Sequence, residues 1–365
     1  MTDLFQPYAL GRLRLRDRFV RSATTSAWAD ERGVVGAEII ARYEELAAGG
    51  VGLIVKGHLY VDPKGKAHTG MAGISDDGHV PALATLVDGV HRNGGVIVAQ
   101  INHAGCEAEA GERMGPSDLE TPEWRARAMD AREIREVVKA FGAAGRRAMD
   151  AGFDGVQIHA AHGYLLSQFL SRLANRRTDE WGGSLADRMR LLREVYLELR
   201  TRLGDDTVIG MKLNCDDFSE SGFTVDESAE VAHELAQLGI DFIEVSGGGF
   251  GMEAQYQARA RATEATLAAY PALAEASFAG HCARIREATG STALALVDGL
   301  QTLAGMQAVV DSGLADLVSL CRPFIREPDL VKKLAAGQRE ATCTRCDGCS
   351  SEEVFGVQMM RCTLD

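Results

Sequence analysis

Two histidines and a tyrosine stand close together in the segment 158–164, at His159, His162 and Tyr164. A pair of imidazole donors suits a carbonyl oxygen, because hydrogen bonds aimed at that atom strengthen as it acquires enolate charge. The phenol is the natural proton donor, since an unperturbed pKa near ~10 keeps it protonated at neutral pH. Two other roles stay open for the histidines alone: a zinc pair, or structural side chains with satisfied hydrogen bonds.

A glycine and an arginine each follow a short apolar run near the end of the chain. Gly299 stands in Asp298-Gly299-Leu300 and Arg322 in Cys321-Arg322-Pro323. In barrels of alternating strands and helices, the loops after the last two strands commonly bind a phosphate. Backbone amides approach it where glycine leaves room, and a cation balances the charge. Each residue alone is more often a turn or a surface salt bridge, so their joint placement carries the prediction of a phosphate site.

Two polar residues fall within apolar runs in the middle of the chain. Gln100 ends the run Val98-Ala99-Gln100, and Lys212 lies in Gly210-Met211-Lys212-Leu213. A side-chain amide can exchange paired hydrogen bonds with a pyrimidine-like ring edge, and an inward-pointing ammonium can stabilise negative charge on a reduced flavin. A buried lysine without an anion would be costly. The alternative for Gln100 is an ordinary polar residue at a barrel mouth.

Eight short runs rich in Val and Ile alternate with helical stretches, a pattern typical of parallel strands joined by crossover helices. Eight runs, rather than five or six, favour closure into a barrel over an open sheet. We therefore expect an α/β fold: an eight-stranded parallel (β/α)8 TIM barrel over residues 1–336 and a short cysteine-rich C-terminal extension over 337–365. The expected strands are 18–22, 51–56, 96–101, 155–159, 208–213, 242–246, 293–298 and 317–321.

Signals for helices and loops agree with this division. Asp130 with Glu133, and Thr224 with Glu227, are typical of reciprocal amino-terminal caps. Since the carboxyl ends of barrel strands form the catalytic mouth, long connections after strands are expected there, as lids and substrate contacts. Three connections are too long for simple turns, and all follow expected strands: 104–129, 160–184 and 247–281.

Composition limits the class of partner. The net charge of -13 argues against a nucleic acid or a membrane surface, since either would require clustered Lys and Arg. No run of eighteen apolar residues occurs, and the first residues lack the order of a secretory signal. We expect a soluble cytoplasmic enzyme acting on small molecules, and the oligomeric state, a homo-oligomer included, stays open. The eight cysteines are expected to be thiols or metal ligands rather than disulfides.

From Leu4 to about Leu334 the chain resembles the Old Yellow Enzyme, or NADH:flavin oxidoreductase, family of FMN barrels. Its most recognisable segments are 18–24, 167–171, 175–179 and 182–184. The resemblance implies that His159 and His162 hold the substrate oxygen and that Tyr164 donates a proton. It implies flavin contacts, the last two of them to the phosphate, at Ala23, Thr24, Gly57, Gln100, Lys212, Gly299 and Arg322.

The function that this resemblance implies is FMN-dependent ene reduction. Hydride would pass from NAD(P)H by way of the flavin to the β-carbon of an α,β-unsaturated carbonyl compound, while Tyr164 protonates the α-carbon. The chain has no Gly-x-Gly-x-x-Gly fingerprint, which agrees with transient nicotinamide binding on the flavin. The alternative is a flavin-dependent amine dehydrogenase, demethylase or desaturase of the trimethylamine dehydrogenase type. A third hypothesis is a metal-thiolate protein on an inactive barrel, against which the intact catalytic set argues.

Four cysteines of the extension, Cys343, Cys346, Cys349 and Cys362, are separated by two, two and twelve residues. Three close thiolates and a distant fourth suit a 4Fe-4S cubane cluster. The spacing is similar to that of the trimethylamine dehydrogenase and 2,4-dienoyl-CoA reductase branch of the family, whose members are longer. Zinc held by four thiolates, or reduced thiols without a metal, are the competing interpretations. A metal would also fasten the extension to the barrel.

Overall fold

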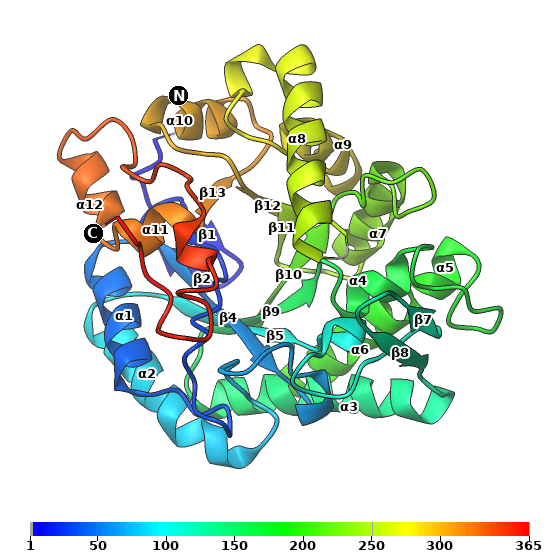
Figure 1. Cartoon of the computed structure of the whole chain (residues 1–365). Helices are drawn as coiled ribbons and strands as arrows, with labels where there is room; N and C mark the ends of the chain where they lie inside the picture. The colour runs from blue at the N-terminus through cyan, green and yellow to red at the C-terminus, as the bar shows by residue number, and fades with distance from the viewer. Residues whose placement is uncertain (1–2, 250, 365) are drawn as a thin grey trace.

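Eight parallel strands close into a barrel in the computed structural model, which describes residues 3–249 and 251–364 (Figure 1). Neighbouring strands follow chain order, and β13 pairs with β3 to complete the ring. The predicted (β/α)8 TIM barrel is confirmed. Its strands are β3 (Phe19–Arg21), β4 (Leu53–Tyr60), β5 (Ile97–Asn102), β9 (Gly155–Ala160), β10 (Val208–Asn214), β11 (Phe242–Ser246), β12 (Ala293–Val297) and β13 (Leu317–Leu320).

Helices alternate with the strands around the outside of the barrel (Figure 1). Both predicted capping boxes are present, at Asp130 with Glu133 and at Thr224 with Glu227, and they satisfy N–H groups that a first helical turn leaves without partners. In the described part of the chain, no helix is both long and apolar enough to cross a membrane. The covering helices are α1 (Ala37–Ala48), α2 (Val80–Arg92), α3 (Ala131–Asp150), α6 (Arg190–Leu203), α7 (Val225–Gln237), α9 (Ala279–Thr289), α10 (Leu303–Asp311) and α12 (Leu330–Ala335).

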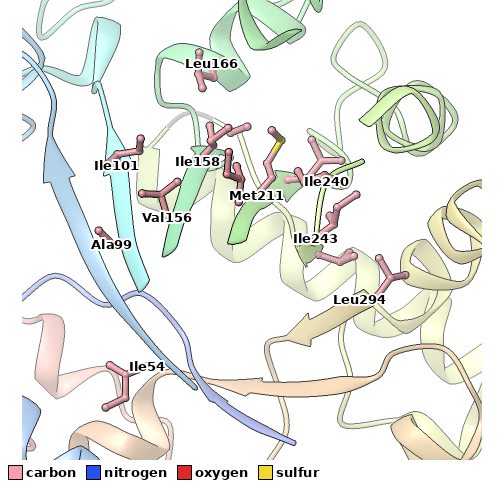
Figure 2. Close-up of a cluster of buried hydrophobic side chains, with 14 of the residues drawn as sticks. Ile54, Ala99, Ile101, Val156, Ile158, Leu166, Met211, Ile240, Ile243 and Leu294 are labelled. Carbon is pink, nitrogen blue, oxygen red and sulfur yellow. The ribbon is translucent and has the colours of Figure 1, made fainter. Parts of the chain in front are cut away.

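Alternation of side chains along each strand divides the buried core into two parts. Ala99, Met211 and Ile243 belong to the large cluster between the strands and the helices (Figure 2). Val20 and Phe242 belong to a second cluster that fills the amino-terminal end of the barrel interior. Because this end is filled, a ligand must approach from the carboxyl ends of the strands. Two further strands contribute side chains to the second cluster, β1 (Tyr8–Leu10) and β2 (Leu13–Leu15).

The three long connections contain their own short elements. The first folds into a small sheet, which the sequence did not predict because its strands are only two to four residues long. The second and third each contain a helix, α4 and α8. Their bounds are β6 (Met114–Gly115), β7 (Leu119–Glu120), β8 (Arg125–Ala128), α4 (Leu165–Leu170) and α8 (Gly251–Ala269).

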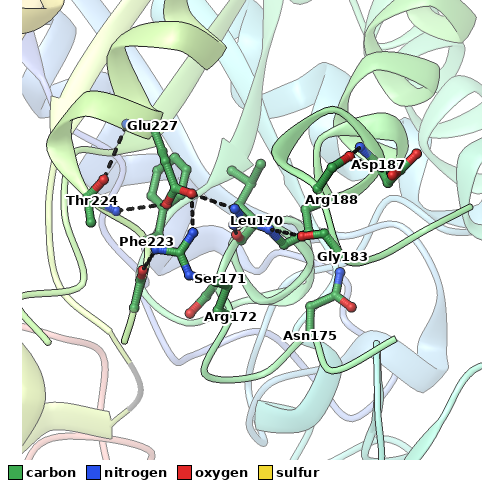
Figure 3. Close-up of polar contacts among 12 residues, drawn as sticks. Leu170, Ser171, Arg172, Asn175, Gly183, Asp187, Arg188, Phe223, Thr224 and Glu227 are labelled. Atoms are coloured by element: carbon green, nitrogen blue, oxygen red, sulfur yellow. Dashed lines mark hydrogen bonds and ion pairs between the residues drawn. The ribbon is translucent and has the colours of Figure 1, made fainter. Parts of the chain in front are cut away.

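Buried Arg188 braces the connection 160–184 against helix α7 (Figure 3). Its guanidinium donates to the carbonyl oxygen of Leu170 and pairs with the Glu227 carboxylate at 2.5 Å. Arg172 pairs with the same carboxylate from the other side. Because Arg188 is only 2 % exposed, its two contacts are shielded from water, whereas the Arg172 side chain is 43 % exposed. The brace fixes the segment that follows the predicted catalytic residues.

The cysteine-rich extension packs on the barrel mouth. After α12 the chain leaves the strand and helix alternation and includes one short 3-10 turn, η5 (Gly348–Ser350) (Figure 1). The backbone N–H of Leu303 donates to the carbonyl of Arg339, and that of Met360 donates to Ser26. The extension is therefore fastened near its start to the first residue of α10 and near its end to the loop after β3. The domain division between residues 336 and 337 stays a prediction.

Candidate active site

A cavity of about 380 Å³, the first cavity, opens at the carboxyl ends of the barrel strands. This end carries the active site in barrel enzymes, and the volume is in the range of small-molecule sites. The wall of this cavity brings together residues that are far apart in the sequence. The predicted site residues that line it are Ala23, Thr24, His162, Lys212 and Arg322.

Gly57 allows strand β4 to approach the end of β3. A Cβ atom at this position would lie 2.6 Å from the Cβ of Ala23 and 2.7 Å from the backbone nitrogen of Thr24. Since Cβ atoms do not approach other atoms so closely, a larger residue would displace the wall of the first cavity. The Thr24 hydroxyl in turn lies 2.9 Å from the sulfur of Cys321, at the end of β13.

A buried polar network lies in the barrel interior and reaches the first cavity at Lys212. Gln100 donates to Gln157 at 2.7 Å, and Gln157 donates to the Glu244 carboxylate at 2.9 Å. The ammonium of Lys212 lies 3.4 Å from the same carboxylate. Burial acts to raise the pKa of Glu244, but the charge of Lys212 and hydrogen bonds from two serines and Gln157 hold it below its usual value. Glu244 is thus the anion that a buried Lys212 requires.

A second cavity of about 590 Å³ adjoins the first and shares Thr25, His162 and Phe355 with it. Tyr164 also lines the second cavity. The ring centroid of His159 lies 5.1 Å from that of His162 and 5.1 Å from that of Tyr164. His159 is 4 % exposed and lines neither cavity, so it packs behind the other two side chains. The structure gathers all three predicted catalytic residues, and their roles stay a prediction.

All three of these side chains are neutral at pH 7. Burial, with the nearby imidazoles of His162 and His58 and the ammonium of Lys212, lowers the pKa of His159 far below its usual value. Burial with Lys212 lowers the pKa of His162 to about 3. Burial raises the pKa of Tyr164 to about 12. The backbone N–H of Ala161 points to Nδ1 of His159 at 3.4 Å, a contact that favours the tautomer with the proton on Nε2. Nε2 of His162 lies 2.7 Å from the hydroxyl of Ser246. A neutral imidazole can still donate one N–H, and the phenol retains its proton.

Arg322 lies on the wall of the first cavity between two carboxylates. It pairs with Asp347 of the extension and lies 3.8 Å from Asp298. Gly299 has a φ of +83°, and a Cβ atom there would lie 1.8 Å from the carbonyl oxygen of Glu275. Close packing of two loops therefore accounts for this glycine. Its contact with a phosphate stays a prediction.

The residues of the first cavity fit FMN in chemical type. Arg322 can balance a phosphate, and Lys212 can face the polar edge of a ring system. Apolar surface for a flat ring comes from Ala23, Val297 and Phe278 on the same wall. The wall thus holds side chains suited to the phosphate, to the polar ring edge and to the flat ring of the cofactor.

The four cysteines of the extension line one small hollow beside Arg322. All four are free thiols, and the guanidinium of Arg326 donates to the sulfur of Cys362 at 3.1 Å. Within residues 3–249 and 251–364, no three His, Cys, Asp or Glu side chains are grouped closely enough to hold a metal ion. The donor set suits a soft metal or a cluster. Cys343, Cys346, Cys349 and Cys362 as metal ligands stay a prediction.

Several residues at the site were not identified from the sequence. The ring centroid of His58 lies 5.2 Å from that of Tyr164, and the ring of Phe355 lies 4.8 Å from that of His68. His58 lies beyond the expected end of the second strand, and Phe355 belongs to no motif. Glu244 did leave a signal: it is a charged residue in the middle of an expected buried strand.

A closed barrel with a cavity at its carboxyl end, a guanidinium on the cavity wall and a buried ammonium defines a small-molecule enzyme of the β/α-barrel class. A family model described as NADH:flavin oxidoreductase / NADH oxidase matches residues 3–341. The chain belongs to that family. The resemblance seen in the sequence is confirmed, and flavin and a nicotinamide cofactor are the cofactors of this family.

Similar proteins include members of two different lengths. An NADH oxidase from Thermoanaerobacter brockii is 30 % identical over the whole chain, which covers 56 % of that protein. An NADPH dehydrogenase from Bacillus subtilis is 32 % identical over 91 % of the chain and 94 % of that protein. A solved structure of 2-naphthoyl-CoA reductase has a TM-score of 0.90 at 28 % identity, with 99 % of this chain and 56 % of that chain covered. The chain spans about half the length of the longer relatives.

Proposed function

We propose that the enzyme uses NAD(P)H to reduce the C=C bond of an α,β-unsaturated carbonyl compound, with FMN as cofactor. The observation that carries this proposal is the junction of the two cavities at His162. Lys212 and Arg322 line the cavity on one side of it, and Tyr164 lines the cavity on the other. FMN, when bound, supplies a group that accepts hydride from the nicotinamide and delivers it to the alkene. The printed names of similar proteins, NADPH dehydrogenase and 2-naphthoyl-CoA reductase, agree with reductive chemistry.

Side chains of the protein bind the substrate oxygen and supply the proton. His162, supported from behind by His159, donates an N–H to the carbonyl oxygen, and this bond strengthens as the oxygen gains charge. Tyr164 holds its proton at the wall of the second cavity and gives it to the α-carbon. Because burial suppresses imidazolium formation, hydrogen bonding rather than a full positive charge stabilises the oxygen.

Turnover of 2-cyclohexenone with NADPH or NADH under anaerobic conditions tests the proposal. We expect cyclohexanone as product, one equivalent for each nicotinamide oxidised, and a yellow protein. Protein stripped of flavin serves as the control and should form no product. Nicotinamide oxidation by yellow protein without any reduced ketone, across several conjugated carbonyl compounds, would contradict the proposal.

A second candidate is an amine dehydrogenase or demethylase, favoured by the charge of the second cavity. Glu107, Glu109 and Glu352 line this cavity, and no Lys or Arg is among its described lining residues. Such a wall favours a cationic substrate over an anionic one. An N,N-dimethylglycine/sarcosine dehydrogenase from Chromohalobacter salexigens is 29 % identical over 98 % of the chain and 52 % of that protein. Bleaching of the flavin by methylated amines, but not by NAD(P)H, would favour this candidate.

We also propose a 4Fe-4S cluster on the four cysteines of the extension. Support comes from their spacing and from the hollow that all four line. Iron and sulfide analysis of protein purified without oxygen is the test, with an absorbance spectrum before and after reduction. Zinc instead of iron, or neither metal, would contradict the cluster and leave the proposal for the barrel unchanged.

A further inference from the structure

Glu244 lies in the middle of β11 with its side chain completely buried, at 0 % exposure. Both of its carboxylate oxygens have two polar neighbours. One accepts from the hydroxyls of Ser22 at 2.7 Å and Ser319 at 2.6 Å. The other accepts from the amide of Gln157 at 2.9 Å and lies 3.4 Å from the ammonium of Lys212. A buried carboxylate with this many donors is stabilised as the anion.

The Glu244 carboxylate determines which way the side-chain amides of Gln157 and Gln100 are turned. Because an ionised carboxylate only accepts, Gln157 must turn its NH2 group toward Glu244 and its carbonyl toward Gln100. Gln100 then donates its own NH2 group to that carbonyl at 2.7 Å. The two glutamines are direct neighbours on β5 and β9, so the strand pairing supports the relay. The relay uses only the NH2 group of Gln100, a residue that is 1 % exposed, and so leaves its carbonyl oxygen as the acceptor of this amide.

The same carboxylate orients the ammonium of Lys212. Lys212 is paired directly with Glu244 in the register of β10 and β11. Its ammonium donates to the Ser22 hydroxyl at 2.8 Å, and that hydroxyl donates its hydrogen to Glu244. Lys212 lines the first cavity, whereas Glu244 lines neither cavity. The Glu244 carboxylate thus sets the Gln100 carbonyl as an acceptor by way of the Gln157 amide, and it sets the Lys212 ammonium as a donor.

We propose that Glu244 is a positioning residue of the cofactor site, which sets Gln100 as a hydrogen-bond acceptor and Lys212 as a donor toward the pyrimidine edge of the flavin. This edge carries an N–H, at N3, between two carbonyl groups, so it requires one acceptor and flanking donors. Glu244 acts only through its neighbours and contacts no part of the cofactor. The proposal rests on the FMN site of the proposed function.

Glu244→Gln is the matched substitution, because it keeps the side-chain volume and removes the charge. A glutamine at 244 can donate as well as accept, so Gln157 loses its fixed direction and Gln100 can present its NH2 group. We expect the dissociation constant of FMN to rise about tenfold or more, measured by fluorescence quenching on apoprotein. We also expect the N3 proton of bound ¹⁵N-labelled FMN to lose the downfield NMR shift of a hydrogen-bonded N–H. Asp17→Asn, a buried carboxylate before β3, is the control and should change neither quantity.

The dissociation constant and the N3 resonance, both measured on Glu244→Gln, separate a positioning role from a purely structural one. A higher dissociation constant with an unchanged N3 resonance would give Glu244 a structural role only and overturn the proposal, as would an unchanged dissociation constant. If Glu244→Gln does not fold, Gln157→Met tests the same relay, and the N3 resonance should shift in the same way. Wild-type protein with no affinity for FMN would overturn the proposed function as well. Tight wild-type binding with an insensitive N3 resonance overturns only the role of Glu244.

Discussion

At the scale of single residues, Tyr164 is the most direct test of the proposed chemistry. We expect Tyr164→Phe to leave reduction of the flavin by NAD(P)H unchanged and to slow alkene reduction by on the order of a hundredfold or more, because only the second step needs the phenolic proton. Stopped-flow absorbance of the two half-reactions measures both rates. Equal rates for wild type and variant in the alkene step would remove the proton-donor role.

The pKa of Tyr164 adds a pH dependence to this test. Burial raises this pKa to about 12, so the phenol stays protonated at neutral and mildly alkaline pH. We expect the wild-type alkene step to be nearly independent of pH between about 6 and 9. A rate that falls with a midpoint near neutral pH would assign proton donation to another group.

The predicted catalytic residues were easier to find in the sequence than the residues that surround them. His159, His162 and Tyr164 lie within one short segment, so spacing alone predicted that they meet. Lys212 was expected to need an anion. The residues next to it in the sequence do not identify that anion, because Glu244 lies on the next strand. Strand periodicity could have found Glu244, because it alternates with the outward-facing Ile243. His58 was missed because its strand runs past the last residue of the apolar pattern.

At the scale of elements, all eight barrel strands were predicted from their apolar runs, and the largest difference is in the second. This strand was expected over 51–56, whereas β4 spans Leu53–Tyr60. An irregularity between Lys56 and Leu59 lets the strand continue beside β5 past Gly57. Pairing with a neighbour, rather than local preference, decides where such a strand ends. The sequence of one strand therefore cannot fix its boundary.

Gly299 provides a stability prediction for the loop after β12. A Cβ atom there would lie 1.8 Å from the Glu275 carbonyl, at a φ of +83°. We expect Gly299→Ala to lower the free energy of unfolding by about 3 kcal/mol or more in urea titrations. Gly313→Ala is the matched control, since Gly313 has a φ of +75° and nothing within 4 Å of its Cβ position. That variant should lose only about 1 kcal/mol; equal losses would contradict the packing explanation.

Asp17, two residues before β3, predicts a pH dependence of stability. Burial raises its pKa from 3.8 to about 7, so the folded state holds a proton that the unfolded state releases. The contribution of Asp17 is therefore most favourable below about pH 4 and is lost as the pH rises toward 7, by on the order of 4 kcal/mol. We expect Asp17→Asn to be more stable than wild type at pH 8 and similar at pH 4. Urea unfolding at both values measures the difference, and a constant difference would contradict this assignment.

At the scale of the whole molecule, the position of the extension was the least predictable feature. Its cysteines were conspicuous in the sequence, but their placement beside Arg322 depends on contacts between residues far apart in the chain. Phe355 and Met360 of the extension line the first cavity together with strand-end residues. The extension is thus part of the wall of the candidate site, and a change within it should affect cofactor binding.

The ion pair between Asp347 and Arg322 connects the extension to the proposed phosphate end of the first cavity. Asp298 is the second carboxylate near this guanidinium, at 3.8 Å. A phosphate that binds Arg322 must approach both carboxylates, and their repulsion weakens its binding. We expect Asp347→Asn to bind FMN about tenfold more tightly, measured by flavin fluorescence quenching on apoprotein.

Riboflavin, which lacks the phosphate, is the matched control ligand, and its affinity should not change. Arg322→Gln should have the opposite effect, weakening FMN and sparing riboflavin, because only the phosphate needs the cation. If Asp347→Asn changed the affinity for both ligands equally, the carboxylate would act on the shape of the cavity and not on the phosphate. The pair of ligands therefore separates charge repulsion from a displaced extension, two effects that a single dissociation constant cannot distinguish.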